Sequence, residues 1–128
     1  SLSSELCEMS SPLSQKSFEF ALHIVRTGRS IQEVRGDYIL SRQLIRSGTA
    51  IGALLAEARY AESQADFLHK LKIALKEANE CLYWIGLMTA SELMGPETQH
   101  DLTARVRELI AMLVSAVNTL DRQNKKGR

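Results

Sequence analysis

RSGTAIGALLAEA, the stretch from Arg46 to Ala58, sets Gly48 and Gly52 four residues apart in a segment whose surroundings have a strongly helical composition. Each glycine inside a helix costs about 1 kcal/mol relative to alanine, so a compensating contact is needed. Small residues let two helices approach more closely than the usual interaxial distance of about 8–10 Å. We therefore expect a helix whose glycine-bearing side packs tightly, against its own bundle or against another subunit.

Two other patterns built on paired glycines are excluded. Gly-x-x-x-Gly pairs helices in membranes, but this region carries the charged residues Arg42, Arg46, Glu57 and Arg59. No apolar run reaches the roughly 20 residues that a membrane span needs, so we expect no membrane association. A phosphate-binding loop would continue with Gly-Lys-Ser or Gly-Lys-Thr, and no such sequence follows the glycines.

The overall composition favours one soluble helical domain. The chain has 128 residues, is 45% hydrophobic and 24% charged, and contains only 5% aromatic residues and two prolines. The formal net charge is +1, which excludes a strongly basic nucleic-acid binder, so such a function would have to rest on a local patch. Cys7 and Cys81 are expected to be reduced, and no basic-then-apolar leader opens the chain. We therefore expect a cytoplasmic protein.

Apolar residues recur at helical spacing in four segments. Helices are expected over residues 13–27, 37–61, 64–93 and 97–122. Gly28 is expected to end the first helix, and the connector after it to lay Ile31 and Val34 on the core. Ser63 and Asp66 form a capping box in front of the third helix. Four long helices with short connections predict an all-α, up-down-up-down antiparallel four-helix bundle.

The predicted domain organisation follows from these segments. A serine-rich N-terminal tail is expected over residues 1–12, the four-helix bundle domain over 13–122, and a basic C-terminal tail over 123–128. In the first helix, the apolar face is expected to contain Leu13, Phe18, Ala21, Leu22 and Val25.

The segment from Ser41 to Met88 closely resembles the 23S rRNA-intervening sequence protein family. The matching pieces include RSG at 46–48, IGA at 51–53, IALKEA at 73–78 and the YW pair at 83–84. The chain departs from the family pattern at Leu54, where the family has Asn, and at Cys81, where it has Thr. The resemblance implies a four-helix bundle that often assembles as a ring-shaped homopentamer, with no established catalytic activity. The resemblance also implies a role with nucleic acid, which was proposed for such proteins from their genomic setting.

Basic residues on the second and third helices are the candidate contacts to RNA or DNA. They are Arg42, Arg46, Lys70, Lys72 and Lys76. In a ring, a few charges per subunit would be repeated around the axis, which allows salt-dependent binding to phosphates. The alternative is that these residues only form a solvated helical face. No surface with interleaved aromatic residues suggests that bases are read.

Two further groups of residues are candidates for structural roles. Gly48, Gly52, Tyr83 and Trp84 are expected in helix packing or at a subunit interface, with one of the two aromatic residues in the core. Arg46, Glu57, Glu77 and Glu80 are expected to form arginine–glutamate ion pairs inside the bundle or across subunits.

Catalytic and metal-binding patterns are weak, so we expect no enzyme, no metal and no cofactor. Asp66 and His69, and likewise Glu97 and His100, have the spacing of a di-iron motif, but each pair opens a helix near solvent. The histidines share no pattern with a nucleophile. The function predicted is a non-enzymatic oligomeric bundle that binds nucleic acid or a nucleoprotein. The alternative is a scaffold that docks a protein partner, whose identity the sequence does not give.

Overall fold

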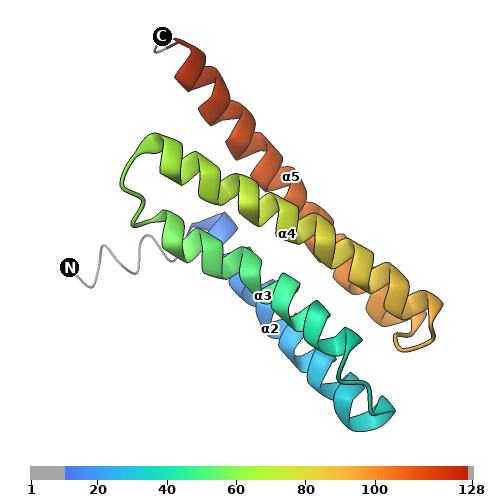
Figure 1. Ribbon diagram of the computed structural model, residues 1–128. Coiled ribbons are helices and arrows are strands. Elements are labelled where there is room, and N and C mark those ends of the chain that lie inside the picture. The colour runs from blue at the N-terminus through green and yellow to red at the C-terminus, as the bar shows by residue number, and fades with distance from the viewer. Residues whose placement is uncertain (1–10, 127–128) are drawn as a thin grey trace.

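The computed structural model describes residues 11–126, which form four α-helices (Figure 1). They are α2 (Pro12–Arg35), α3 (Leu40–Ala58), α4 (Gln64–Ala90) and α5 (Pro96–Lys126). This confirms the predicted all-α four-helix arrangement. Most of the predicted N-terminal tail, with Cys7, lies outside the described residues. Residues 123–126 of the predicted C-terminal tail continue α5.

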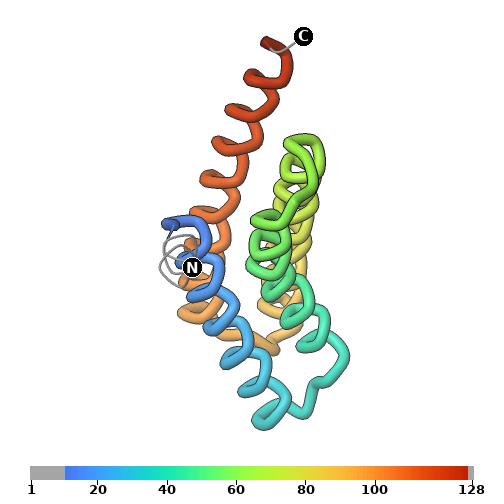
Figure 2. Tube along the Cα trace, turned by 90° about the vertical axis from the view of Figure 1, so that its left-hand side faces the viewer, coloured from blue at the N-terminus to red at the C-terminus, as the bar shows by residue number. Residues whose placement is uncertain are grey.

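The helices are packed in a cyclic order, as the two views in Figures 1 and 2 show. In the described chain the backbone of α3 lies beside those of α2 and α4, and the backbone of α5 lies beside those of α4 and α2. The backbones of α2 and α4 do not approach each other, so these two helices lie on a diagonal. The C-terminal end of α5 extends beyond the ends of the other helices (Figure 2). None of the four helices has an apolar stretch long enough to cross a bilayer.

The core follows the three- and four-residue spacing of the sequence. On α4 and α5, every fully buried position falls on one helical face, which is the pattern of an amphipathic helix. These buried residues are Leu68, Leu71, Ala74, Ala78, Cys81, Ile85 and Met88 on α4, and Leu102, Val106, Leu109, Leu113 and Val117 on α5.

Helix starts are where the sequence predicted them for α2, α4 and α5. Pro12 and Pro96 are the first residues of their helices, where a missing backbone N–H costs nothing. The Ser11 hydroxyl accepts a hydrogen bond from Ser14 N at 3.2 Å. The Ser63 hydroxyl accepts one from Asp66 N at 3.0 Å, which confirms the serine cap of α4.

The predicted end of the first helix was wrong. Helix α2 continues through Gly28 to Arg35, and the segment expected as a connector is its last two turns. The helix ends at Gly36, whose φ of 70° is the left-handed conformation that favours glycine. Gly36 N donates to the Gln32 carbonyl at 3.1 Å, which closes the last turn.

Gly28 is buried in the middle of α2 because α3 crosses it closely. A Cβ built on Gly28 would stand 2.5 Å from Cγ1 and Cδ1 of Ile45. The contact is reciprocal, since a Cβ on Gly48 of α3 would stand 2.7 Å from Cγ1 and Cγ2 of Ile24. Gly52 lies beside Ser17, with its virtual Cβ 3.5 Å from the Ser17 carbonyl oxygen. The glycines therefore serve the tight α2–α3 contact within the bundle.

Buried serines accompany these glycines and satisfy their own polar groups. The Ser17 hydroxyl donates to the Ser14 carbonyl at 2.9 Å, and the Ser47 hydroxyl donates to the Gln43 carbonyl at 3.0 Å. A hydroxyl that bonds to its own helix can be buried without the cost of an unsatisfied donor. The α2–α3 contact thus combines small side chains with hydroxyl groups whose hydrogen bonds are satisfied.

The predicted inward face of the first helix was wrong for most of its residues, although Leu13 packs against the core as expected. Phe18 is 68% exposed and Leu22 is exposed as well, while the buried face consists of Ser17, Phe20, Ile24, Gly28 and Ile31. Ile31 lies in the core as predicted, but Val34 is 75% exposed. Helix α2 has two apolar faces, and only the one that carries Phe20 and Ile24 packs inside this bundle.

Helix α3 is shorter than predicted at both ends. Asp37 lies before the helix, and its carboxylate accepts a hydrogen bond from Ser41 N at 2.9 Å. After Ala58 the chain turns, with Tyr60 N donating to the Glu57 carbonyl at 2.9 Å. Helix α4 ends three residues before its predicted end, at Ala90, and α5 continues four residues beyond its predicted end, to Lys126.

Candidate functional site

A cluster of charged side chains joins α3 to α4 on the outside of the bundle. Arg46 Nη1 lies 2.9 Å from Glu77 Oε2, and Arg46 Nη2 forms an ion pair with Glu80 Oε2. The Arg46 Nε also donates to Gln43 Oε1 at 3.3 Å. Because α3 and α4 are antiparallel neighbours, residues more than 30 positions apart meet here. The structure thus brings together three of the four residues predicted to form ion pairs.

The fourth of these residues has a different partner from the one expected. Glu57 Oε2 lies 3.6 Å from Lys70 Nζ, so it faces a lysine on α4 and not an arginine. Both side chains are partly exposed. Ion pairs at this exposure contribute only about 0–1 kcal/mol to stability. The carboxylate of Glu57 therefore offsets the positive charge of Lys70.

The two aromatic residues extend the Arg46 cluster along α4. Trp84 Nε1 donates to Glu80 Oε2 at 3.4 Å, and its half-buried ring packs against the core. The Tyr83 ring meets it edge-on, with 5.1 Å between ring centroids and 75° between planes. Tyr83 itself is 62% exposed. The aromatic pair therefore has one member packed on the core and one facing outward.

The five basic candidates for nucleic-acid contact divide into paired and unpaired residues. Arg46 and Lys70 face the glutamates described above, and Lys72 Nζ lies 3.6 Å from Asp121 Oδ1 on α5. Arg42 and Lys76 are exposed, and within residues 11–126 neither has an ion-pair partner. Arg42 lies one turn before Arg46, and Lys76 lies next to Glu77, so the two flank the charged cluster.

An apolar groove of about 710 Å³ runs along the outside of α2 and α3. Gly52, Ala53 and Ala56 line its α3 side, and Phe18 and Ala21 line its α2 side. Sequence reasoning missed this groove because it assigned Phe18 to the core. The second apolar face of the first helix was the feature of the sequence that could have indicated this groove.

A smaller, more polar pocket of about 330 Å³ lies between the second half of α2 and the turn that joins α4 to α5. Hydroxyl groups and two arginines line it together with apolar side chains. The turn is held by Leu93 N and Met94 N, which both donate to the Met88 carbonyl, at 2.8 and 3.2 Å. The sequence did not reveal this pocket, because its α2 residues fall mainly in the segment expected as a connector.

Residues of catalytic and metal-ligating types are dispersed. In the part of the chain that the structure describes, no group of three or more His, Cys, Asp or Glu side chains could hold a metal ion. The Asp66–His69 and Glu97–His100 pairs lie in the first turns of α4 and α5, at opposite ends of the bundle (Figure 1).

Cys81 is a free, fully buried cysteine on α4. Burial raises the pKa of its thiol to about 12, against the opposing effect of a hydrogen bond with Ser47. A thiol with such a pKa is protonated at neutral pH and is a poor nucleophile. Cys81 therefore serves packing, in line with its place among Ala74, Ala78 and Ile85.

Comparison with known proteins agrees with the resemblance predicted from Ser41–Met88. Residues 10–115 match the family described as 23S rRNA-intervening sequence protein. The fold matches the crystal structure of a protein of unknown function from the S23 ribosomal protein family of Bacteroides thetaiotaomicron, with a TM-score of 0.81 and 39% identity. That match covers 82% of this chain and 97% of the other. Among curated proteins, none matches this sequence.

Proposed function

Since this chain belongs to the 23S rRNA-intervening sequence protein family, we propose that it is a non-enzymatic homo-oligomer that binds the phosphate backbone of nucleic acid. In this proposal the four-helix bundle is the subunit of a ring, and unpaired basic side chains on its outer face supply the contacts. The observation that carries the proposal is the pair of exposed cations, Arg42 and Lys76, on adjacent helices.

Exposed apolar residues on opposite helices support the assembly. Phe18 and Leu22 project from α2, and Tyr83 and Leu87 project from α4, which lies across the diagonal from α2. Large apolar side chains in exposed clusters are typical of protein interfaces. Two different patches on separated sides suit a head-to-tail contact, which closes into a ring when the rotation allows. A pentamer is the ring that family resemblance favours.

Repetition in the ring supports nucleic-acid binding despite a net charge of only +1. Arg42 and Lys76 alone would be repeated in a pentamer to about ten cations around its axis, enough for salt-dependent phosphate contacts. Arg42 and Lys76 carry no compensating acid within residues 11–126, so they do not have to break an ion pair to bind. Phosphates are present at every nucleotide, so contacts of these cations to the backbone do not depend on the base sequence.

A second candidate function is a scaffold that docks a protein partner and binds no nucleic acid. The observation in its favour is that Arg46, Lys70 and Lys72 already face carboxylates. In that case the apolar groove along α2 and α3 would be the main functional surface. The two candidates differ in one respect: the first expects the basic side chains to bind phosphates, and the second expects them to bind none.

The experiment that tests the proposal combines mass and binding on one sample. Light scattering gives the mass, and fluorescence anisotropy of a labelled structured RNA and a DNA duplex is titrated with the protein at two salt concentrations. We expect a mass near five times 14.3 kDa and an affinity that falls steeply as salt rises. An oligomer that binds neither probe at low salt would favour the scaffold.

A further inference from the structure

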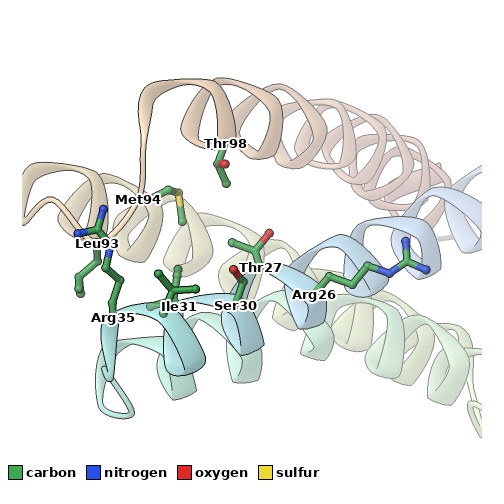
Figure 3. A pocket seen from close by; sticks show the side chains of 9 residues that line it. Arg26, Thr27, Ser30, Ile31, Arg35, Leu93, Met94 and Thr98 are labelled. Atoms are coloured by element: carbon green, nitrogen blue, oxygen red, sulfur yellow. The ribbon is translucent and has the colours of Figure 1, made fainter.

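The pocket between α2 and the α4–α5 turn has the composition of an anion-binding site with an apolar floor (Figure 3). Thr27 and Ser30 of α2 and Thr98 of α5 face the same space from its two sides. Ile31 and Met94 lie beneath them, both buried in the core. No acidic side chain lines the pocket. A ligand there would meet hydroxyl donors above an apolar surface.

The hydroxyls of this pocket are not used by the fold. Many hydroxyls of the helices donate to the carbonyl three or four residues earlier, among them those of Ser17, Ser41, Ser47, Thr49, Thr89 and Thr119. Within the described chain, the side chains of Thr27, Ser30 and Thr98 form no such bond and no other hydrogen bond. All three are therefore available to an incoming oxygen.

Two arginines flank the pocket along α2. Neither Arg26 nor Arg35 has an ion-pair partner among residues 11–126. They are nine residues apart, which corresponds to about 13.5 Å along the helix axis at 1.5 Å per residue. In Figure 3 the Arg26 guanidinium points along α2, away from Arg35. One phosphate could not contact both groups, so a ligand that uses both must carry at least two separated anionic groups.

We propose that this pocket binds a single-stranded segment of RNA or DNA, with separate phosphates on Arg26 and Arg35. The hydroxyls of Thr27, Ser30 and Thr98 donate to oxygens of the nucleotides between them, and an unstacked base lies on the apolar floor. Unstacked bases are available in single strands and not inside a duplex. This inference rests on the nucleic-acid binding proposed above, to which it adds a place and a preference for single strands.

The test compares the affinities of one sequence as a single strand and as a duplex, each as RNA and DNA, by fluorescence anisotropy. The variant Arg26→Gln/Arg35→Gln removes two charges at the pocket. The matched control Arg107→Gln/Lys125→Gln removes two exposed charges that neither line the pocket nor belong to the proposed contacts, so the net charge is equal. We expect the wild-type protein to prefer single strands and the pocket variant to lose that preference, with a drop of about tenfold or more for the single strand. Its salt dependence should also weaken by about 1.4 in log–log slope, since each phosphate contact contributes about 0.7.

A charge-neutral variant, Thr27→Val/Ser30→Ala, gives a second measurement, with circular dichroism as the check on folding. We expect it to weaken single-strand binding and leave duplex binding unchanged. If the pocket variant and the control lower the affinities for single strand and duplex by the same factor, the proposal for the pocket is overturned. The proposal of nucleic-acid binding would then still stand. If the wild-type protein binds no probe at low salt, the proposed function fails and the pocket proposal fails with it.

Discussion

Ile24 on α2 lies directly over Gly48 on α3, so that a Cβ built on the glycine would stand 2.7 Å from both Cγ atoms of the isoleucine and 3.1 Å from its Cβ. Ile24 is fully buried. The contact therefore involves the base of a side chain that its own neighbours hold in place, and it cannot be relieved by turning the far end of a flexible chain.

Gly48→Ala is expected to destabilise the protein although alanine is the better helix former. Overpacking a filled core costs about 1–3 kcal/mol, which exceeds the helix-propensity gain of about 1 kcal/mol. We expect the free energy of unfolding to fall by about 1 kcal/mol, measured by urea denaturation. Gly86→Ala is the matched control, because Gly86 lies inside α4 with nothing within 4 Å of its virtual Cβ. That variant should gain about 0.5–1 kcal/mol, and equal gains in both would contradict the tight contact.

Arg46→Gln is expected to weaken the bundle by leaving two glutamates without their cation. The Glu77 side chain is only 18% exposed, and Glu80 lies on the same helix one turn away. For partly exposed pairs we expect a loss of about 1 kcal/mol, discounted for solvent screening. Urea denaturation at low and high salt is the measurement, and the loss should shrink at high salt. A loss that does not depend on salt would show that Arg46 acts through packing of its alkyl stem.

The fold could be predicted from the sequence, but the details of α2 could not. In the sequence, a glycine that ends a helix looks the same as a glycine that makes room for a neighbouring side chain. The contact with Ile45 shows that Gly28 has the second role. Phe18 and Phe20 likewise belong to two apolar faces of one helix, and periodicity does not say which face the bundle uses. Tertiary packing decides both questions.

The candidate site was predicted in part for the same reason. The Arg46 cluster could be anticipated, because arginine and glutamate on adjacent antiparallel helices tend to pair. That Glu57 would face Lys70 depended on the relative rotation of α3 and α4, which the sequence does not specify. The polar pocket joins α2 to a turn more than 50 residues later along the chain, so no local motif marks it.

Phe18→Glu is expected to dissociate the proposed oligomer without unfolding the subunit. Phe18 is exposed at the apolar groove, so a charge there costs little in the isolated bundle but would be buried in a subunit interface. Light scattering should give a mass near that of one 14.3 kDa chain. Val34→Glu, at an equally exposed apolar position outside the groove, should keep the wild-type mass. If Phe18→Glu also keeps the wild-type mass, the groove is not the subunit interface.

Cys81 is expected to make stability depend on pH in the alkaline range. Burial raises the pKa of its thiol to about 12 in the folded protein, whereas an unfolded cysteine has a pKa of about 8.5. Below pH 8 both states are protonated and the thiol has no pH-dependent effect. Between these two pKa values the unfolded state loses its proton and the folded state keeps it, so the free energy of unfolding falls as pH rises.

This dependence can be measured in a Cys7→Ser background, which leaves Cys81 as the one remaining thiol of the two in the sequence. From pH 7 to pH 10 the free energy of unfolding should fall by about 2 kcal/mol more than in the same background with Cys81→Ala, because only the thiol differs between the two proteins. Urea denaturation at the two pH values gives both numbers. Equal falls would mean that the thiol ionises as readily in the folded as in the unfolded state, which is incompatible with its place in the core.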